Sequence, residues 1–227
     1  MKTKIAIVAR YPFYFQDIFE SLSGLGIDIY SATDIKEIQE ARENGIKFDY
    51  IFFPHYSRIV PVWFLAQNNC IGFHTGDLPK DRGGSPIQHK ILRGEYFTFV
   101  SALKLIEKID AGDIICREKI SLEFGSIEET LKRISKIIAQ MIFTILTENP
   151  VPIPQVGTGN ISHRFKSQDS EFDLSTLKVR EIYDRIRMLD GLDYPSARVV
   201  VGSYTLLMSN AQLRDGKLTF VTQVEEK

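Results

Sequence analysis

YIFFPHYSRIVPVWFLAQNNCIGF, residues Tyr50–Phe73, is the stretch of sequence that decides the fold. It opens with a short apolar run, continues with apolar residues at helical spacing over Ile59–Ala66, and ends with a second apolar run at Cys70–Phe73. Tyr50–Phe53 does not alternate between apolar and polar residues, which is typical of a strand that is covered on both faces. A strand, a helix and a second strand in this order predict a right-handed crossover between parallel strands.

The residues before Tyr50 repeat the same alternation of strands and helices. Lys4–Arg10 (KIAIVAR) and Ile27–Tyr30 predict strands, whereas Phe15–Leu25 and Asp34–Arg42 predict helices. Strands that alternate with helices of about ten residues specify an α/β fold with an open, mostly parallel sheet of the Rossmann-like type. Ligands of such sheets bind beyond the carboxyl ends of the strands, so the residues that follow Phe53 and Phe73 are candidates for a site.

The pattern changes after Phe73. Thr75–Ser85 is a loop rich in Gly and Pro, which lets the backbone approach a ligand closely. Ser126 and Glu129 form the sequence signature of a capping box at the start of a long amphipathic helix. The elements predicted here are a helix from Pro86 to Arg93, strands at Phe97–Ile106 and Ile114–Ile120 joined by a tight turn, and a helix at Ser126–Glu148.

A linker is predicted at Asn149–Thr158 (NPVPIPQVGT), because three prolines and a glycine interrupt regular structure. Residues 1–150 are therefore predicted to form the main domain, and residues 151–227 the linker and a small C-terminal α+β appendage. In the appendage the sequence predicts a helix at Val179–Leu189 and short strands at Val199–Leu207 and Lys217–Val221.

The composition of the chain argues against nucleic acid and membrane partners. The 227 residues contain 28 Lys and Arg against 29 Asp and Glu, so there is no basic excess to bind nucleic acid phosphates. No apolar run approaches the roughly 18 residues of a membrane-spanning helix, and no membrane partner is expected. Cys70 and Cys116 form no CxxC pair, which favours reduced thiols, a cytoplasmic location and no metal site.

The first strand is not followed by GxGxxG, and the chain has no Walker A motif, so NAD, FAD and nucleoside triphosphates are disfavoured. His74 is the histidine that follows the fourth predicted strand, at the edge of the sheet where active sites form. The sequence therefore predicts a site around His74 and the Gly-rich loop after it.

Two stretches, FHTGDLPKDRGGSPIQHKIL (Phe73–Leu92) and ALKLIEKIDAGDII (Ala102–Ile115), resemble the folate-dependent formyltransferase family. That family has Asn-x-His, then a Leu-Pro-x-x-Arg-Gly loop, then a Leu-Asp-x-Gly-Asp turn. The resemblance implies N10-formyltetrahydrofolate as the formyl donor and an amine as the acceptor. It also implies that His74 takes or relays the proton of the amine, while Asp110 holds the imidazole in place. The residues that the resemblance assigns to the folate are Leu78, Pro79 and Gly84 in the loop and Ile106, Glu107, Lys108, Ile109 and Asp110 in the turn.

The chain departs from the family pattern at one position. Gly72 stands where the family has Asn, and a glycine has no side chain to donate a hydrogen bond to the developing oxyanion. His55 follows the third strand, whose carboxyl end neighbours that of the fourth. We therefore predict that His55 supplies the missing donor, and that Gly72 leaves room for it.

The C-terminal segment EIYDRIRMLDGLDYPSARV (Glu181–Val199) is similar to the segment that follows the catalytic domain of sugar N-formyltransferases, with the pseudaminic acid branch as the nearest match. This resemblance implies a nucleotide-linked 4-amino-4,6-dideoxy sugar as the acceptor. It assigns substrate contacts to Arg187, Asp190 and Tyr194. A transfer RNA acceptor is disfavoured, because the C-terminal segment has no surplus of cationic residues.

Two other functions remain open at the level of sequence. A 10-formyltetrahydrofolate hydrolase would use water in place of the amine. A folate- or nucleotide-sugar-binding module without catalysis is compatible with Gly72. The sequence does not fix the oligomeric state, although a homodimer is compatible with it.

Overall fold

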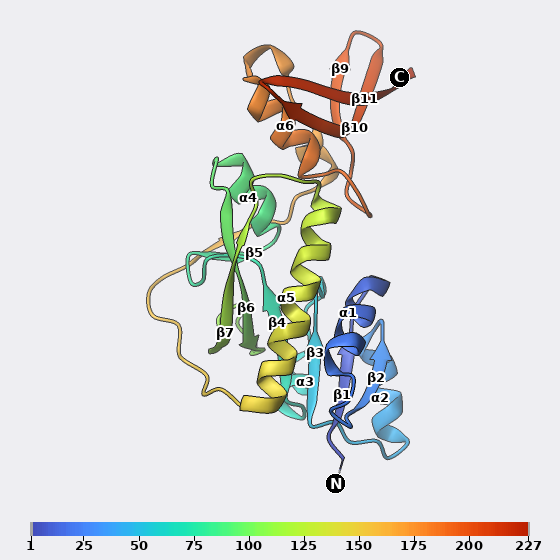
Figure 1. Cartoon of the computed structure of the whole chain (residues 1–227), viewed down its shortest axis with the longest axis vertical. Coiled ribbons are helices and arrows are strands. Elements are labelled where there is room, and N and C mark those ends of the chain that lie inside the picture. The colour runs from blue at the N-terminus through green and yellow to red at the C-terminus, as the bar shows by residue number, and fades with distance from the viewer. Residues whose placement is uncertain (1, 227) are drawn as a thin grey trace. The chain divides into compact units, whose positions relative to one another are not determined.

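The computed structural model describes residues 2–226 and contains a six-stranded sheet with the strand order β2-β1-β3-β4-β6-β7 (Figure 1). The first four strands along the chain pair in parallel, whereas β6 runs antiparallel to β4. The predicted α/β fold with a mostly parallel sheet is therefore confirmed. The strands are β1 (Lys4–Val8), β2 (Asp28–Ala32), β3 (Tyr50–Phe53), β4 (Cys70–His74), β6 (Phe97–Lys104) and β7 (Ile114–Ser121).

The helices begin where prolines and capping residues allow them to. The first helix starts earlier than predicted, because Pro12 occupies its first turn. The third helix starts later than predicted, because Pro61 forms its N-cap. Ser126 and Glu129 exchange the two hydrogen bonds of the predicted capping box. The helices are α1 (Pro12–Leu22), α2 (Ile35–Glu43), α3 (Val62–Ala66), α4 (Pro86–Leu92), α5 (Ile127–Glu148) and α6 (Val179–Arg187).

Apolar side chains of β1 and β3 form the core beneath α2 and α3. Phe53 packs in this cluster with Ile38 of α2 and Phe64 of α3, and all three are nearly inaccessible to solvent. Helices α1 and α5 lie side by side, because Ser21 Oγ donates to the Ala139 carbonyl and Ser135 Oγ donates to the Phe13 carbonyl. The core therefore fixes the strands whose carboxyl ends carry the predicted site.

The described chain forms two compact units, each assembled from several segments. One comprises residues 1–82, 99–120 and 132–160, and the other comprises 83–98, 121–131 and 161–227. The domain boundary predicted at residue 150 stays a prediction, since both units draw on segments from either side of it.

The second of these units, which includes residues 161–227 and is called the C-terminal unit below, contains a three-stranded sheet with the order β11-β10-β9. The strand predicted at Val199–Leu207 is in fact two strands, β9 (Ala197–Val201) and β10 (Tyr204–Arg214), because the chain turns at Gly202, whose φ is 60°. The last strand, β11 (Lys217–Glu226), extends five residues beyond the predicted end. Sequence alone therefore underestimates this sheet.

The predicted linker is pinned to the main sheet. Ile153 exchanges two backbone hydrogen bonds with Ile114 of β7, at 2.8 and 2.9 Å. Further along, the Asn160 N–H donates to the Lys80 carbonyl, and the short strands β5 (Asp81–Gly83) and β8 (Asn160–Ser162) pair. The segment thus packs on the structure that carries the site.

Both cysteines are free thiols; Cys70 is buried and Cys116 is half-buried. Burial raises the pKa of Cys70 to about 12 and that of Cys116 to about 11. Neither thiol is therefore suited to act as a nucleophile near neutral pH. Among the helices of residues 2–226, none is long and apolar enough to span a bilayer.

Candidate active site

His74 is the last residue of β4, and its imidazole contacts Asp110 in the turn between β6 and β7. His74 Nδ1 lies 3.4 Å from Asp110 Oδ2, and the histidine is 6% exposed. Asp110 has a φ of 49°, in the left-handed region that aspartate tolerates better than most residues. The structure therefore brings together the two residues that the sequence predicts as the centre of the site.

The second ring nitrogen of His74 faces the loop that follows β4. His74 Nε2 lies 2.5 Å from the Asp81 carbonyl oxygen. Gly76 permits this arrangement, because a Cβ at that position would lie 2.5 Å from His74 Nε2. The glycine is thus required for close packing of the loop against the imidazole.

Gln155 joins the Asp110 turn to this loop. Its Nε2 donates to the carbonyl oxygens of Asp110 and Gly112, both at 2.8 Å. Its Oε1 accepts from Arg82, whose Nη2 lies at 2.8 Å. Sequence analysis missed Gln155, because it lies in a proline-rich segment that resembles a linker; Arg82 belongs to the quoted loop motif, but no role was assigned to it.

A second polar contact holds the start of the loop. Arg117 of β7 donates to Asp77 at 2.8 Å, and its guanidinium lies 3.8 Å from the ring centroid of Phe99. The Asp77 N–H in turn donates to the Asp81 carboxylate. These contacts tie the loop to β6 and β7, which also carry the Asp110 turn.

The space beside Gly72 is filled by a residue that the sequence analysis did not consider. A Cβ at Gly72 would lie 2.5 Å from Leu105 Cδ2, so the leucine takes the space that an asparagine side chain would need. His55 has a φ of 51° and lies among aromatic rings, with centroids 5.5 Å from Tyr11 and 6.1 Å from Tyr14. The role predicted for His55 stays a prediction.

The residues predicted to bind folate differ in exposure. Leu78 is buried, whereas Ile106 and Ile109 are exposed at 48% and 44%. Glu107 and Lys108 are exposed as well, so the turn presents both apolar and charged groups next to Asp110. Gly84 belongs to the other compact unit.

Arg187, one of the predicted substrate residues, is 1% exposed. Its Nε donates to Asp184, while its two terminal nitrogens donate to the carbonyl oxygens of Leu122 and Gly125, at 2.7 to 3.1 Å. The geometry supports a structural role for Arg187, which joins α6 to the loop before α5. Its predicted contact with the substrate stays a prediction.

The other two predicted substrate residues are also held by protein contacts. Asp190 accepts from the Asn210 N–H at 2.8 Å, and burial raises the pKa of its carboxyl. Burial likewise raises the pKa of Tyr194, against a smaller opposing effect of its hydrogen bond with Gln88. Their substrate roles stay predictions.

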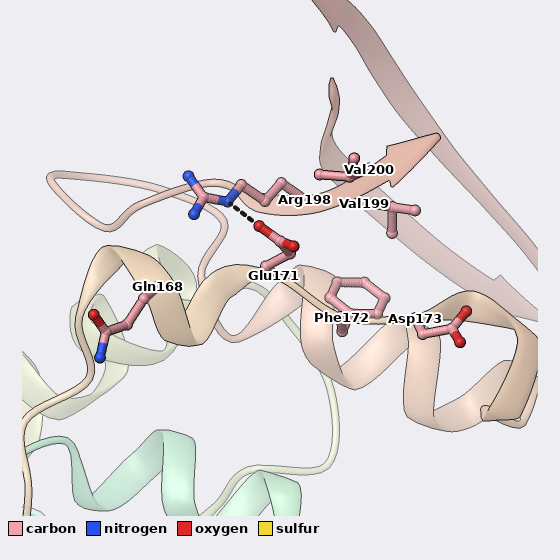
Figure 2. Close-up of a pocket in the computed structure, with 7 residues that line it drawn as sticks. All are labelled: Gln168, Glu171, Phe172, Asp173, Arg198, Val199 and Val200. Atoms are coloured by element: carbon pink, nitrogen blue, oxygen red, sulfur yellow. Dashed lines mark ion pairs between the residues drawn. The ribbon is translucent and has the colours of Figure 1, made fainter. Parts of the chain in front are cut away.

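A cavity of about 560 Å³ lies in the C-terminal unit, and Figure 2 shows its lining. Arg198 of β9 forms an ion pair with Glu171 across it, at 3.4 Å. The cavity includes none of the residues predicted for the site. Its full lining is Gln168, Glu171, Phe172, Asp173, Arg198, Val199 and Val200.

Two family profiles match the chain. The formyl transferase profile covers residues 31–146, and a profile described as the C-terminal domain of methionyl-tRNA formyltransferase covers residues 167–225. Together they account for most of both predicted parts of the chain.

Solved structures and curated relatives agree with these matches. The chain is 35% identical to a structure named methionyl-tRNA formyltransferase from Clostridium thermocellum, covering 99% of this chain and all of that one, with a TM-score of 0.91. It also has the fold of a 4-N formyltransferase from Francisella tularensis, at 19% identity, a TM-score of 0.70, and coverage of 99% and 98%. Methionyl-tRNA formyltransferase of Sulfurimonas denitrificans is 30% identical over 66% of this chain and 52% of its own length. The chain spans about half the length of the curated relatives it matches.

Replacing Arg187 tests its structural role. We expect Arg187→Ala to lower the free energy of unfolding by about 2 kcal/mol or more, because the Leu122 and Gly125 carbonyl groups would lose their donor, while the buried Asp184 carboxylate would retain Arg180 but lose Arg187. Urea denaturation measures the change. Arg214→Ala, at an exposed position of the same unit, is the matched control and should change stability by less than about 0.5 kcal/mol. Equal effects of the two substitutions would contradict the assignment.

Proposed function

This chain belongs to the formyl transferase family, and we propose that it transfers a formyl group from N10-formyltetrahydrofolate to the primary amine of a small acceptor. The family predicted from the two sequence motifs is confirmed, whereas the activity and the acceptor are our proposal. The observation that carries it is the contact between His74 and Asp110. This contact lies beside the loop after β4, which the side chains of Arg82, Gln155 and Arg117 hold in place.

His74 acts as the proton acceptor for the amine. In the proposal Nδ1–H donates to Asp110, which fixes the ring, and Nε2 takes the proton that leaves the attacking nitrogen. Nε2 lies 2.5 Å from the Asp81 carbonyl oxygen, a contact that requires a proton on Nε2 because a carbonyl oxygen only accepts. In the proposal the form with the proton on Nδ1 is therefore reached when this contact opens as the acceptor binds.

The turn that carries Asp110 fits a folate. Ile106 and Ile109 expose apolar surface suited to the flat face of a pterin, and the exposed backbone of the turn offers donors and acceptors to the edge of its ring. The bound donor supplies an electrophilic formyl carbon. Gln155 holds the turn next to His74, because its amide donates to two carbonyl groups of the turn.

His55 is the proposed donor to the formyl oxygen. It leaves β3, the strand next to β4, and a neutral imidazole can donate one hydrogen bond. Since Leu105 fills the space over Gly72, His55 reaches the site in this proposal from the side of Tyr11 and Tyr14.

For the acceptor we propose a nucleotide-linked 4-amino-4,6-dideoxy sugar. Residues 161–227 contain ten Lys and Arg and ten Asp and Glu, so this segment has no net charge with which to attract a polynucleotide. The 4-N formyltransferase from Francisella tularensis has the same fold over nearly the whole length of both chains. This likeness supports the proposal at the level of fold.

Methionyl-tRNA is the second candidate acceptor. It is favoured by the names of the Clostridium thermocellum structure and of the curated relatives, and by the description of the C-terminal profile. The curated relatives are about twice the length of the part that this chain matches, whereas the Clostridium thermocellum structure is matched over its whole length. The two acceptors differ in size and charge, which makes them easy to distinguish.

The roles of His74 and Asp110 are tested by replacing each residue in turn. We expect His74→Asn and Asp110→Ala each to lower turnover at saturating substrate by about a hundredfold or more, because a positioned acid–base group is typically worth that much. Steady-state formyl transfer measures the loss, and circular dichroism checks the fold. Turnover close to that of the unaltered protein in either variant would rule out the proton relay.

Gln155 is tested as a positioning residue. We expect Gln155→Leu to lower kcat by about tenfold with little change in the KM of the acceptor. The leucine cannot bind the carbonyl groups of the Asp110 turn, so the turn loosens, but position 155 does not contact the acceptor in this proposal. Gln155→Asn, which keeps the amide but shortens the side chain, serves as the conservative variant and should lose less. A purely structural role would lower stability and leave kcat of the folded fraction unchanged.

The acceptor is tested by competition in one assay. Formation of tetrahydrofolate should be accelerated by a nucleotide-linked 4-amino sugar and not by methionyl-tRNA. Acceleration by the tRNA that falls steeply with salt would instead favour the second candidate. Formate release without any amine would indicate a hydrolase, and folate binding without turnover would indicate a binding module.

A further inference from the structure

The cavity of about 560 Å³ in the C-terminal unit contains charged side chains that the proposed formyl transfer does not use. It lies between residues 168–173 and β9 (Figure 2). The main chain joins these two walls, because the Phe172 N–H donates to the Arg198 carbonyl oxygen at 3.1 Å and Glu171 pairs with Arg198 in a parallel bridge. Sites for small organic molecules measure about 300 to 1,000 Å³. The cavity is therefore preformed and large enough for such a ligand.

Arg198 brings into this cavity a guanidinium group whose donors are not used by the protein. Its Nε is buried and lies 3.4 Å from Glu171 Oε2, but its side chain forms no hydrogen bond with any other residue in the range 2–226. Arg187 of the same unit, by contrast, donates to a carboxylate and to two carbonyl groups. A guanidinium group can hold a carboxylate by two parallel hydrogen bonds. Arg198 thus offers donors to one anionic group of a ligand.

The carboxylates of the cavity disfavour a ligand with several negative charges. Glu171 and Asp173 line the cavity together with one cationic residue, Arg198. Asp173 accepts hydrogen bonds from the N–H and the hydroxyl group of Ser175, at 2.9 and 2.7 Å. The Glu171 side chain is 49% exposed and is paired only loosely with Arg198. A nucleotide or a sugar phosphate would bring two or more negative charges next to Glu171, which is unfavourable. Glu171 instead suits a cationic group of the same ligand.

Apolar side chains form most of the remaining lining. Val199 of β9 is 6% exposed, and Val200 and Phe172 are half-buried. The Arg185 guanidinium group lies 5.4 Å from the centroid of the Phe172 ring, which helps to hold the ring in place. Apolar surface of this kind binds the apolar part of a small ligand. The cavity therefore suits a molecule with one anionic group, one cationic group close to it, and an apolar body.

We propose that this cavity binds a free α-amino acid with an apolar side chain. The carboxylate of the amino acid accepts two hydrogen bonds from the Arg198 guanidinium group, and its ammonium group donates to the Glu171 carboxylate. The apolar side chain packs against Phe172 and Val199. An α-amino acid matches the cavity because its two charged groups are attached to the same carbon atom, as the neighbouring Arg198 and Glu171 require. The proposal concerns a second ligand and does not depend on the proposed formyl transfer.

Binding to the unaltered protein is the first test. We expect saturable binding of at least one of L-leucine, L-methionine and L-phenylalanine, measured by isothermal titration calorimetry without folate. Two analogues of the amino acid that binds most tightly each lack one charge: its amide lacks the carboxylate, and its deaminated acid lacks the ammonium group. Each analogue should bind about tenfold more weakly or worse, because it leaves Arg198 or Glu171 without its partner.

Substitutions locate the binding in this cavity. Arg198→Gln and Glu171→Gln should each weaken binding of the amino acid by about tenfold or more, because each removes one charge and keeps a polar side chain. Arg214→Gln, at an exposed position of β10 in the same unit, is the matched control and should leave the Kd unchanged. Circular dichroism checks that the variants are folded.

The proposal would be overturned if none of the three amino acids bound saturably, or if an analogue that lacks one charge bound as tightly as the amino acid. Unchanged affinity in Arg198→Gln or in Glu171→Gln would also overturn it, and this is the result expected if the amino acid bound near His74 as an acceptor. The analogues are tested on the unaltered protein, so this comparison holds even where a variant is unstable. None of these measurements uses formyl transfer, so a failure here leaves the proposed function to its own tests.

Discussion

The contact between the His74 imidazole and the Asp110 carboxylate depends on the short turn between β6 and β7. β6 pairs with β4, with His74 opposite Ser101 and Gly72 opposite Leu103. The next strand along the chain, β7, is the other neighbour of β6, and the Lys104 N–H donates to the Asp113 carbonyl oxygen where the two strands join. The turn of residues 105–113 between these strands carries Asp110. The site therefore combines the end of a parallel strand with the turn of the two strands beside it.

The side-chain amide of Gln155 holds this contact in place by binding groups of two loops. The Asp110 turn has two carbonyl groups bound by the Gln155 amide, and the loop after His74 is bound through Arg82 to the same amide. One side chain thus sets the distance between the two segments that form the site. An amide is well suited to this task, because it donates and accepts at the same time. The segment that carries Gln155 is itself fixed by the pairing of Ile153 with Ile114.

The C-terminal unit uses a different principle. Its helix α6 is tied to the loop before α5 by a buried ion pair, in which Arg187 and Asp184 also bind backbone and tyrosine groups. Buried charges of this kind are stable only when all of their hydrogen-bonding groups find partners. Its sheet, by contrast, is open at β11 and exposes valines there. The unit therefore combines a buried polar junction with a sheet whose last strand is exposed.

The sequence by itself determined the parallel sheet, most helices and the place of His74 at the end of β4. These features depend on local patterns of apolar residues, on capping residues and on loops rich in glycine, all of which can be identified along the chain. The pairing of His74 with Asp110 was expected only from the resemblance of two motifs to a known family. The roles of Gln155, Leu105 and Arg187 were decided only by the tertiary structure. A glutamine among prolines has no local signal, Leu105 fills the space beside Gly72 only when β6 lies against β4, and the burial of Arg187 depends on a loop more than sixty residues away. Such contacts between distant segments are set by packing, which no pattern along the chain records.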